Sequence, residues 1–366
     1  MLKLQLNQLD LTIEAAFGGP FLIKDGRYDK EVLKRRHNGA TAVHKKWPNS
    51  IFISKSPLDC VERVAMNEGL ALNPDALDYY VPGSSIRGLL RSHAEKIVRT
   101  MSVDGELCCD PFDIAENKTD ALGCTKLLQK HRSFLYRHAC VICKIFGAGG
   151  LSSRIRISEG VLASGFKVRI VDGIGIDRFS GSVQGANFKN QVLEDGSFAF
   201  SISIRNFEIW QLGLLAFVLR DLEDGVLKFG FGKTKGFGAI KGIIAKASVT
   251  YWRPRTDHRL EGFADVMSSL QEDYGAIPFI ATESEEQAPD LGTPALDEFS
   301  LARTYPISVP NYQANEKITD LAMWQSCARQ WLEALRAPNS FKTIQELHEE
   351  VTSENQVGTE TGNVEV

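Results

Sequence analysis

Five of the seven cysteines lie within residues 108–143, at a spacing that suits a metal site. Cys140 and Cys143 form a CxxC pair, and three further cysteines precede them in the chain. Two thiolates on a tight turn and two from a loop can close a tetrahedral, purely structural zinc site. We predict a zinc ion held by four thiolates, with Cys108 as the substitute for the first of them: Cys109, Cys124, Cys140 and Cys143. His131 or His138 could replace one cysteine, and the alternative is a group of buried thiols without metal.

The segment PGSSIRGLLRSH has the residue types of a phosphate site at the start of a helix. Ser84 or Ser85 is placed to cap the helix, and the free amides of a first helical turn attract anions. Arg87 and Arg91 repel each other at i and i+4, and a nearby anion would relieve that repulsion. The alternative is an ordinary capped surface helix in which Glu95 pairs with Arg91.

A second candidate phosphate site is the glycine-rich segment FGFGKTKGFGAIKG. Glycine permits positive φ and lets backbone amides approach phosphates, while lysines neutralise the phosphate charge. We therefore assign Gly232, Lys233, Lys235 and Gly236 to phosphate binding. A nucleotide-binding P-loop is excluded, because its motif requires glycine where Leu227 stands. The alternative is a glycine-rich hairpin with solvated lysines.

The polar segment IDRFSGSVQGANFKNQ lies between two strand-like runs and is predicted to form a projecting hairpin. It carries Arg178, Phe179, Phe188 and Lys189. Aromatic rings that stack on bases, beside cations that contact the backbone, are typical of proteins that bind single-stranded nucleic acid. A hairpin tip that packs on a neighbouring subunit is the alternative.

The elements that must position these residues follow one another as strand, helix, strands, helix and strand. This order predicts an α+β protein of the ferredoxin-like or RRM-like class, with an antiparallel sheet and two helices on one face. The cysteines lie in an insertion of about residues 102–150. The first strand is expected at residues 2–15 with a bulge near Gln8, and the two helices at residues 82–101 and 208–222.

The charge of the 366-residue chain is divided between its two ends. Residues 1–255 contain 36 Lys and Arg against 26 Asp and Glu, whereas residues 256–366 contain 6 against 20. The first part is therefore the one that could hold a polyanion. We expect an RNA-binding domain at 1–255, an acidic helical appendage at 256–340 and a disordered tail at 341–366.

The sequence has neither a run of about 18 apolar residues nor the pattern of a signal peptide. A soluble, cytoplasmic protein without membrane contact is expected.

Together these features resemble the RAMP proteins that form the backbone of type III and type IV CRISPR effector complexes. The matching segments are residues 82–95, 140–147, 176–198 and 230–242, in the family's order. The resemblance implies an RRM-like palm with a projecting thumb hairpin, in subunits that stack along a guide RNA (crRNA). It also implies further partners, namely a complementary target nucleic acid, copies of the same chain and other effector subunits.

The resemblance implies that the serines and arginines at the start of the first helix hold guide phosphates. The glycine-rich loop would lie along the same RNA backbone, and the hairpin would kink the RNA at intervals. The residues expected to bind RNA are Ser84, Ser85, Arg87, Arg91, Arg178, Phe179, Phe188, Lys189, Gly232, Lys233, Lys235 and Gly236.

Cleaving members of the family, those of type III, carry an aspartate in the loop before the first helix. In the best counterpart here, PNSIFISK, Asn49 occupies the aspartate's place and Ser54 that of an arginine. An asparagine cannot take up a proton at neutral pH, so no catalytic residue is expected and a non-cleaving, type IV-like subunit is favoured. Asp59 is the rival position, and Asp25 and Asp29 are poorer ones.

Two alternatives involve cleavage. One is a type III backbone subunit that cuts target RNA through a loop aspartate such as Asp59, with a metal-held water or the 2′-hydroxyl as nucleophile. The other is a metal-free endonuclease that processes precursor guide RNA, with His37 or His44 as general base.

Overall fold

One antiparallel sheet forms the centre of an α+β fold. The computed structural model describes residues 4–37, 43–102, 106–110, 123–130, 136–253, 255, 257–282, 285, 287–296, 302–337 and 340–360. The main sheet has the strand order β2-β6-β1-β7-β9-β8, and β3 also pairs with β6. Its strands are β1 (Asn7–Phe17), β2 (Ile155–Ile157), β3 (Val161–Leu162), β6 (Ser197–Arg205), β7 (Ile240–Tyr251), β8 (Ala295–Leu296) and β9 (Arg303–Pro306).

Strand β1 lies at the middle of this sheet because its apolar residues alternate. Leu9, Leu11 and Ile13 are fully buried on one face, as the period of two predicts. Its neighbours β6 and β7 both run antiparallel to it. The irregularity predicted near Gln8 lies instead between Thr12 and Ile13, where the register with β7 shifts by one residue.

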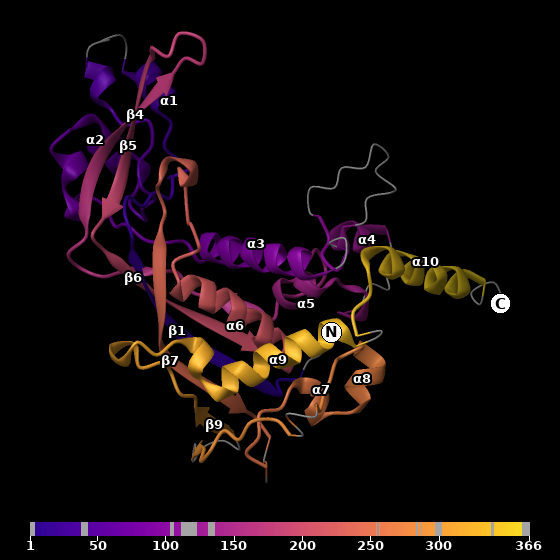
Figure 1. The fold of residues 1–366 in the computed structure, drawn as a ribbon. Coiled ribbons are helices and arrows are strands. Elements are labelled where there is room, and N and C mark those ends of the chain that lie inside the picture. The colour runs from indigo at the N-terminus through magenta and orange to yellow at the C-terminus, as the bar shows by residue number, and fades with distance from the viewer. Residues whose placement is uncertain are drawn as a thin grey trace.

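Two helices, α3 (Gly83–Met101) and α6 (Ile209–Glu223), pack on one side of the sheet (Figure 1). Helix α3 is amphipathic and buries only one stripe of side chains. Helix α6 is buried around most of its circumference, because α9 (Ala322–Arg336) covers its outer side. The rings of Trp210 and Trp331 meet at this contact, with centroids 5.9 Å apart.

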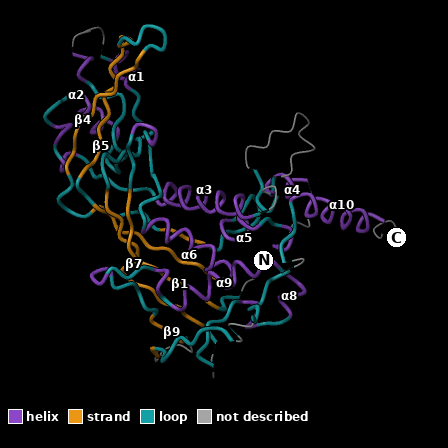
Figure 2. The backbone as a smooth tube through the Cα atoms, viewed as in Figure 1, coloured by secondary structure: helices purple, strands orange, loops and turns teal. Residues whose placement is uncertain are grey.

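The hairpin predicted from the sequence is a separate two-stranded ribbon, β4 (Lys167–Ile176) and β5 (Val183–Glu194). It projects beyond the main sheet, and long loops pack along it (Figures 1 and 2). These loops, residues 18–37 and 43–82, include the short helices α1 (Lys30–Arg36) and α2 (Leu58–Met66). Isolated bridges from Phe21 to Leu193 and from Ser50 to Asn190 attach them to β5. We refer to the ribbon and these loops as the ribbon lobe.

At the other end of α3 lies the cysteine-rich segment, with helices α4 (Cys124–Lys130) and α5 (Val141–Phe146). Helices α7 (Phe263–Val266) and α8 (Ser269–Tyr274) follow the main sheet. No helix in the described part of the chain is long and apolar enough to span a membrane.

The C-terminal residues are more closely integrated with the sheet than an appendage would be. Strands β9 and β8 extend the main sheet beyond β7, and α9 completes the core around α6. Within the segment expected to be a disordered tail from residue 341, residues Ile344–Glu360 form helix α10. Ile344, Leu347 and Val351 are buried, and this apolar spacing of three to four residues explains the helix. Residues 361–366 lie outside the described residues.

The close approach of α6 and α9 depends on Gly213. A Cβ at this position would lie 2.0 Å from the carbonyl oxygen of Cys327, a backbone atom that cannot move aside. Gly213→Ala should therefore lower the free energy of unfolding by about 1–3 kcal/mol in a denaturant titration. Gly88→Ala, at an exposed position of α3 with open space around it, should instead raise that free energy by about 0.5–1 kcal/mol. Equal stability of the two variants would contradict the described contact.

Candidate functional site

The glycine-rich loop between α6 and β7 is pressed against the ribbon lobe. A Cβ at Gly230 would lie 2.3 Å from the carbonyl oxygen of Leu22, and one at Gly238 would lie 1.9 Å from that of Phe229. Both glycines also have positive φ, 84° and 80°. The backbone amide of Phe231 donates to the Leu22 carbonyl at 2.7 Å. Gly230 therefore lets the loop approach the lobe, and Gly238 lets the two arms of the loop approach each other.

The other two glycines of interest shape the exposed part of the loop. Gly232 and Gly236 both have left-handed backbones, and between them Lys233–Lys235 form one turn of 3-10 helix. Both lysines are exposed. The turn therefore presents two ammonium groups to solvent at the place where the loop meets the ribbon lobe.

Lys235 lies beside the ribbon, as two contacts show. Its Nζ is 5.6 Å from the centroid of the Phe188 ring and 6.0 Å from that of Phe231. On the same Phe231 ring stands Lys24, with its Nζ 3.5 Å from the centroid. We call these four residues the lysine–aromatic cluster. Lys235 and Phe188 were predicted to bind RNA, and the structure brings them together from segments far apart in the sequence.

The lysine–aromatic cluster carries positive charge without a compensating carboxylate. Among the described residues, no acidic side chain forms an ion pair with Lys24, Lys233 or Lys235. Burial lowers the pKa of Lys24, and repulsion from Lys235 lowers it further. A bound anion would relieve that repulsion, and the two rings offer faces on which bases can stack.

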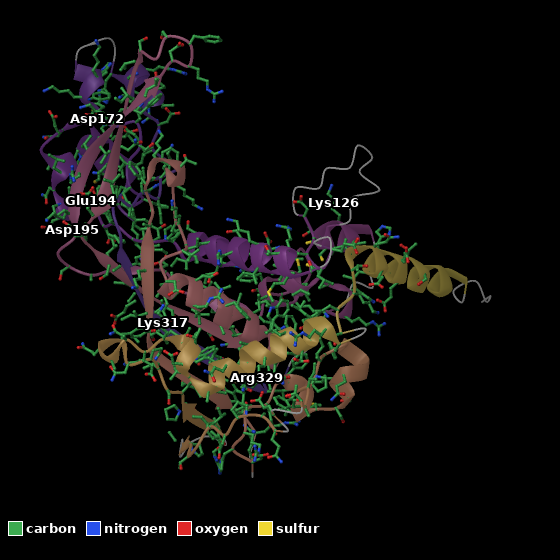
Figure 3. The ribbon with its side chains drawn as sticks, in the orientation of Figure 1. Lys126, Asp172, Glu194, Asp195, Lys317 and Arg329 are labelled. Atoms are coloured by element: carbon green, nitrogen blue, oxygen red, sulfur yellow. The ribbon has the colours of Figure 1, made fainter. Side chains whose placement is uncertain are left out.

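The remaining ribbon residues divide between two places. Lys189 lies next to Phe188 on β5, and its Nζ is 4.0 Å from Asp172 of β4. Figure 3 shows Asp172 along the ribbon, and Glu194 and Asp195 at its base. Arg178 and Phe179 lie in the turn between the strands, where Phe179 is fully exposed. The structure thus separates these two turn residues from the lysine–aromatic cluster.

The serines at the start of α3 do not cap it, which corrects one prediction. The helix begins at Gly83, and Pro82 occupies the N-cap position without any side-chain hydrogen bond. A Cβ at Gly83 would lie 2.7 Å from the carbonyl oxygen of Ser158, so glycine permits the close contact with the segment after β2. Ser84 and Ser85 lie in the first turn instead, and Ser84 is exposed there.

The two arginines in the first half of α3 have partners within the protein. Arg87 donates through Nη2 to the carbonyl of Phe146, and Arg91 donates through Nη1 to that of Gly147 at 3.1 Å. Arg91 also pairs with Glu95 at 2.9 Å, which is the ordinary alternative considered from the sequence. Both guanidiniums thus tie α3 to the end of α5.

Four cysteines converge in the core between α3, α4 and α5, where sulfur atoms gather in Figure 3. The Sγ atoms of Cys109, Cys124, Cys140 and Cys143 all lie within 4.8 Å of one another and are buried. Cys109 Sγ is 3.7 Å from Cys143 Sγ and 3.6 Å from Cys140 Sγ. Zinc–sulfur bonds of about 2.3 Å in a tetrahedron place sulfurs about 3.8 Å apart, so the cluster fits a zinc ion.

A backbone amide and a guanidinium point to two of the four sulfurs. The amide of Cys140 points to Cys124 Sγ at 3.3 Å, and Arg91 Nη2 points to Cys143 Sγ at 3.6 Å. Hydrogen bonds among the thiols, with that of Cys108 first, lower the pKa of Cys140 well below its ordinary value, whereas such hydrogen bonds raise the pKa values of Cys124 and Cys143. Of the two neighbouring cysteines, Cys109 joins the four sulfurs, and Cys108 is a neighbour of Cys140.

The predicted histidine substitutes are not part of this cluster. His138 is fully buried and accepts from Arg137 Nε at 3.2 Å, but it is not among the four converging ligands. His131 lies outside the described residues.

Asn49 connects a loop of the ribbon lobe to the ribbon. Its side-chain Oδ1 accepts from the backbone amide of Lys189 at 2.9 Å. Its own backbone amide donates to the Lys189 carbonyl at 2.6 Å. The ammonium of Lys30 lies 3.4 Å from the same Oδ1. The side chain at this position is therefore held by the ribbon backbone.

The aspartates weighed against Asn49 have different surroundings. Asp59 on α2 is 76% exposed, with Arg63 at 3.9 Å. Asp25 is buried; burial raises its pKa, but hydrogen bonds from Arg27 hold the pKa below its ordinary value overall. Asp29 caps α1 by accepting from the amides of Glu31 and Val32. Of these three carboxylates, that of Asp59 is neither buried nor engaged as a helix cap, so it is the one most accessible to a metal ion.

The two histidines considered as general bases flank one tryptophan. His44 is buried with its ring 4.5 Å from that of Trp47, and His37 is exposed with its ring 6.2 Å away. The buried His44 ring packs on the indole at an interplanar angle of 46°, so His37 is the exposed candidate of the pair.

Sequence reasoning missed Lys24 and Phe231 as members of the candidate site. Lys24 lies in a loop without periodicity, and the contact with Phe231 depends on tertiary packing. A partial signal existed for Phe231, since it lies within the glycine-rich segment.

The fold and these sites define an α+β protein with a central antiparallel sheet, a projecting ribbon and a buried cluster of four cysteines. A family model described as the RAMP superfamily matches residues 17–241, which is more than half of the chain. The chain belongs to the RAMP superfamily, and the resemblance seen in the sequence is confirmed. The match includes α3, the ribbon and the glycine-rich loop. No curated protein matches the chain.

Proposed function

We propose that this protein is a guide-RNA-binding backbone subunit of a CRISPR effector complex that defends against foreign nucleic acid. Membership of the RAMP superfamily supports a CRISPR-associated, RNA-binding subunit. The observation that carries the proposal is the lysine–aromatic cluster, where unpaired ammonium groups and ring faces from three segments meet. This combination suits a single RNA strand, whose phosphates need cations and whose bases need stacking surfaces.

In this proposal the main sheet with α3 and α6 is the palm, and the ribbon β4–β5 is the thumb. The strand order β2-β6-β1-β7 is that expected of a ferredoxin-like βαββαβ unit, which supports this assignment. The RNA would pass between the glycine-rich loop and the ribbon. Ser84 and Ser85 would contact the RNA further along, at the start of α3. Arg87 and Arg91 would contribute indirectly, because their hydrogen bonds attach α3 to the end of α5.

The ribbon turn would serve assembly. Arg178 and Phe179 project where they can meet the RNA or the next copy of the chain in a filament along the guide. Other effector subunits and a complementary target nucleic acid are the further partners in this proposal.

For the cysteine cluster we propose a structural zinc ion. Cys109, Cys124, Cys140 and Cys143 would hold it, and four thiolates leave no position for a water nucleophile. The ion would fix α5, whose C-terminal carbonyls receive Arg87 and Arg91.

The RNA that copurifies with the protein tests the main proposal. Sequencing should recover CRISPR-repeat-derived guides of regular length, because phosphate contacts and stacking hold any guide independently of its spacer sequence. Recovery of bulk cellular RNA without repeat-derived sequence would contradict the proposal.

We predict that the assembled complex does not cut complementary RNA, because Asn49 carries no charge and is held by the Lys189 backbone. The assay is gel analysis of labelled target RNA with Mg²⁺ or Mn²⁺, and it should show an intact target over hours. Regular cuts about six nucleotides apart, the spacing the family resemblance implies for a cleaving backbone, would contradict the prediction. Loss of such cuts in Asp59→Ala would favour the type III alternative, since Asp59 is exposed.

A further inference from the structure

Residues 30–47 form a basic segment near the outer end of the ribbon lobe (Figure 1). Six Lys and Arg residues stand there against one acidic residue, Glu31: Lys30, Lys34, Arg35, Arg36, Lys45 and Lys46. The rings of His37, which follows α1, and of His44, in the 3-10 turn Val43–Lys46, have centroids 6.2 Å and 4.5 Å from that of Trp47. Helix α1 and the 3-10 turn therefore meet at this tryptophan. We refer to the two elements together as the α1 surface.

Ion pairs neutralise only part of the charge on the α1 surface. Three of the six cations have a carboxylate within 3.4 Å, in the pairs Lys34–Glu31, Arg36–Glu62 and Lys46–Glu68. The side chains of Arg35 and Lys45 are exposed and form neither an ion pair nor a hydrogen bond with any described residue. Cations in the last turn of a helix are favourable in themselves, which accounts for Arg35 but not for Lys45 in its separate turn. Two uncompensated charges thus face solvent from adjacent elements.

Positive charge continues from the α1 surface toward the proposed RNA site. Lys30 is buried, and its Nζ lies 3.4 Å from Asn49 Oδ1. Burial lowers the pKa of Lys30, and repulsion from Lys34 and Lys189 lowers it further. Lys189 directly follows Phe188 of the lysine–aromatic cluster in β5. The α1 surface therefore adjoins the cluster through this part of the ribbon.

The α1 surface differs from the lysine–aromatic cluster in its aromatic side chains. Trp47 and Tyr28 are 4% and 8% exposed, so neither ring offers a face to a nucleobase. A basic surface whose large rings are buried contacts phosphates and gives unpaired bases little to stack on. Phosphates are accessible in a paired strand as well, whereas its bases are turned inward. The α1 surface therefore suits a duplex whose other strand lies on the cluster.

We propose that the α1 surface binds the phosphate backbone of the strand that pairs with the guide, through Arg35 and Lys45. This inference rests on the proposed function, because the guide must lie on the cluster for its complement to reach α1. The acidic residues 256–366 of another copy have the charge to meet the same cations. Continuity with the cluster favours nucleic acid, and the experiment separates the two partners.

Fluorescence anisotropy of the full-length protein with a labelled guide RNA, alone and annealed to its complement, tests the assignment. The double variant Arg35→Ala, Lys45→Ala should weaken binding of the annealed RNA about tenfold, because exposed contacts are screened by salt. The salt slope for the annealed RNA should fall by about 1.8, at about 0.9 for each duplex phosphate. Binding of the unpaired guide should change by less than about threefold.

Two further variants and two complements sharpen this experiment. Arg35→Lys with Lys45→Arg preserves the charge and should restore most of the affinity. The control Lys126→Ala, Lys246→Ala removes two exposed lysines elsewhere, one labelled in Figure 3 and one on β7, and should leave both affinities within about threefold. An RNA and a DNA complement present the same phosphates, so a loss seen with only one of them assigns the chemistry of the paired strand.

The outcomes distinguish this inference from the proposed function. Unchanged binding of annealed RNA by the Arg35, Lys45 variant, or equal losses for annealed and unpaired RNA, would overturn the assignment. A changed sedimentation coefficient of the RNA-free variant, with unchanged affinity for annealed RNA, would assign the surface to another copy and overturn it as well. The double variant Lys24→Ala, Lys235→Ala should weaken binding of both RNA forms. If it weakens neither, the proposed RNA path itself is wrong.

Discussion

Replacement of Cys140 with serine should remove one equivalent of zinc per chain and lower the unfolding temperature by about 10 °C or more. Zinc binding contributes about 10–16 kcal/mol in small zinc-dependent peptides, so a loss of about 5 kcal/mol is a conservative expectation here. In a protein of more than 150 residues, each kcal/mol corresponds to about 2–4 °C. Elemental analysis of protein purified without chelators measures the metal, and differential scanning calorimetry measures the unfolding temperature.

The variant should affect more than the metal. Arg91 contacts both Cys143 Sγ and the Gly147 carbonyl, so its position depends on the order of α5. Loss of the ion should therefore loosen the attachment of α3 to α5, and amide exchange along α5 should accelerate before global unfolding.

Two further cysteine variants control this experiment. Cys108→Ser should retain zinc, because Cys109 and not Cys108 lies among the four converging sulfurs. Cys60→Ser, outside the cluster on α2, should also retain it. Full zinc content in Cys140→Ser would contradict the assignment. So would a wild-type protein that contains no metal and is as stable as the zinc-loaded protein; the cysteines would then be buried thiols without metal.

The double substitution Lys24→Ala, Lys235→Ala should weaken binding of single-stranded RNA by about 100-fold. Each charge-assisted contact contributes about 1.5 kcal/mol, and each 1.4 kcal/mol is about tenfold in affinity. The slope of log affinity against log salt should also fall by about 1.4, since each phosphate contact of a single strand contributes about 0.7. Fluorescence anisotropy at several salt concentrations gives both quantities.

The matched control removes two positive charges elsewhere. Lys317 and Arg329, both in the acidic C-terminal part and labelled in Figure 3, form ion pairs with Asp224 and Glu285. Their double replacement by alanine changes the net charge equally but should alter RNA affinity by less than about threefold. If the control and the lysine variant lose affinity equally, binding depends on overall charge rather than on the cluster.

Periodicity in the sequence was sufficient to predict the central elements. The alternation of Leu9, Leu11 and Ile13 identified β1, and an apolar stripe identified α3, because burial on one face imposes these periods. Helix α6 was recognised as a largely apolar run instead, because it is buried on most sides. The four-cysteine cluster was also predictable, since thiolates that share a metal must come from a small set of spacings.

Tertiary contacts account for what the sequence could not indicate. Arg87 and Arg91 looked available to an anion, but the carbonyls that they bind belong to the end of α5, far along the chain. Lys24 gave no signal, because its place on the Phe231 ring depends on glycines that press the loop against the lobe. Helix α10 was missed because its polar composition outweighed three apolar residues that pack on a surface formed by other segments.

The central position of β1 also has a kinetic consequence. Gln8 of this strand pairs with Arg205 on one side and with Thr250 on the other, and β7 in turn pairs with β9. A ribosome therefore releases the middle strand of the sheet long before either of its partners exists. Contacts so distant along the chain slow folding, because long loops must close before they gain any stabilisation. The nascent chain should expose the apolar face of β1 through most of its synthesis, and chaperone binding during translation should concentrate there.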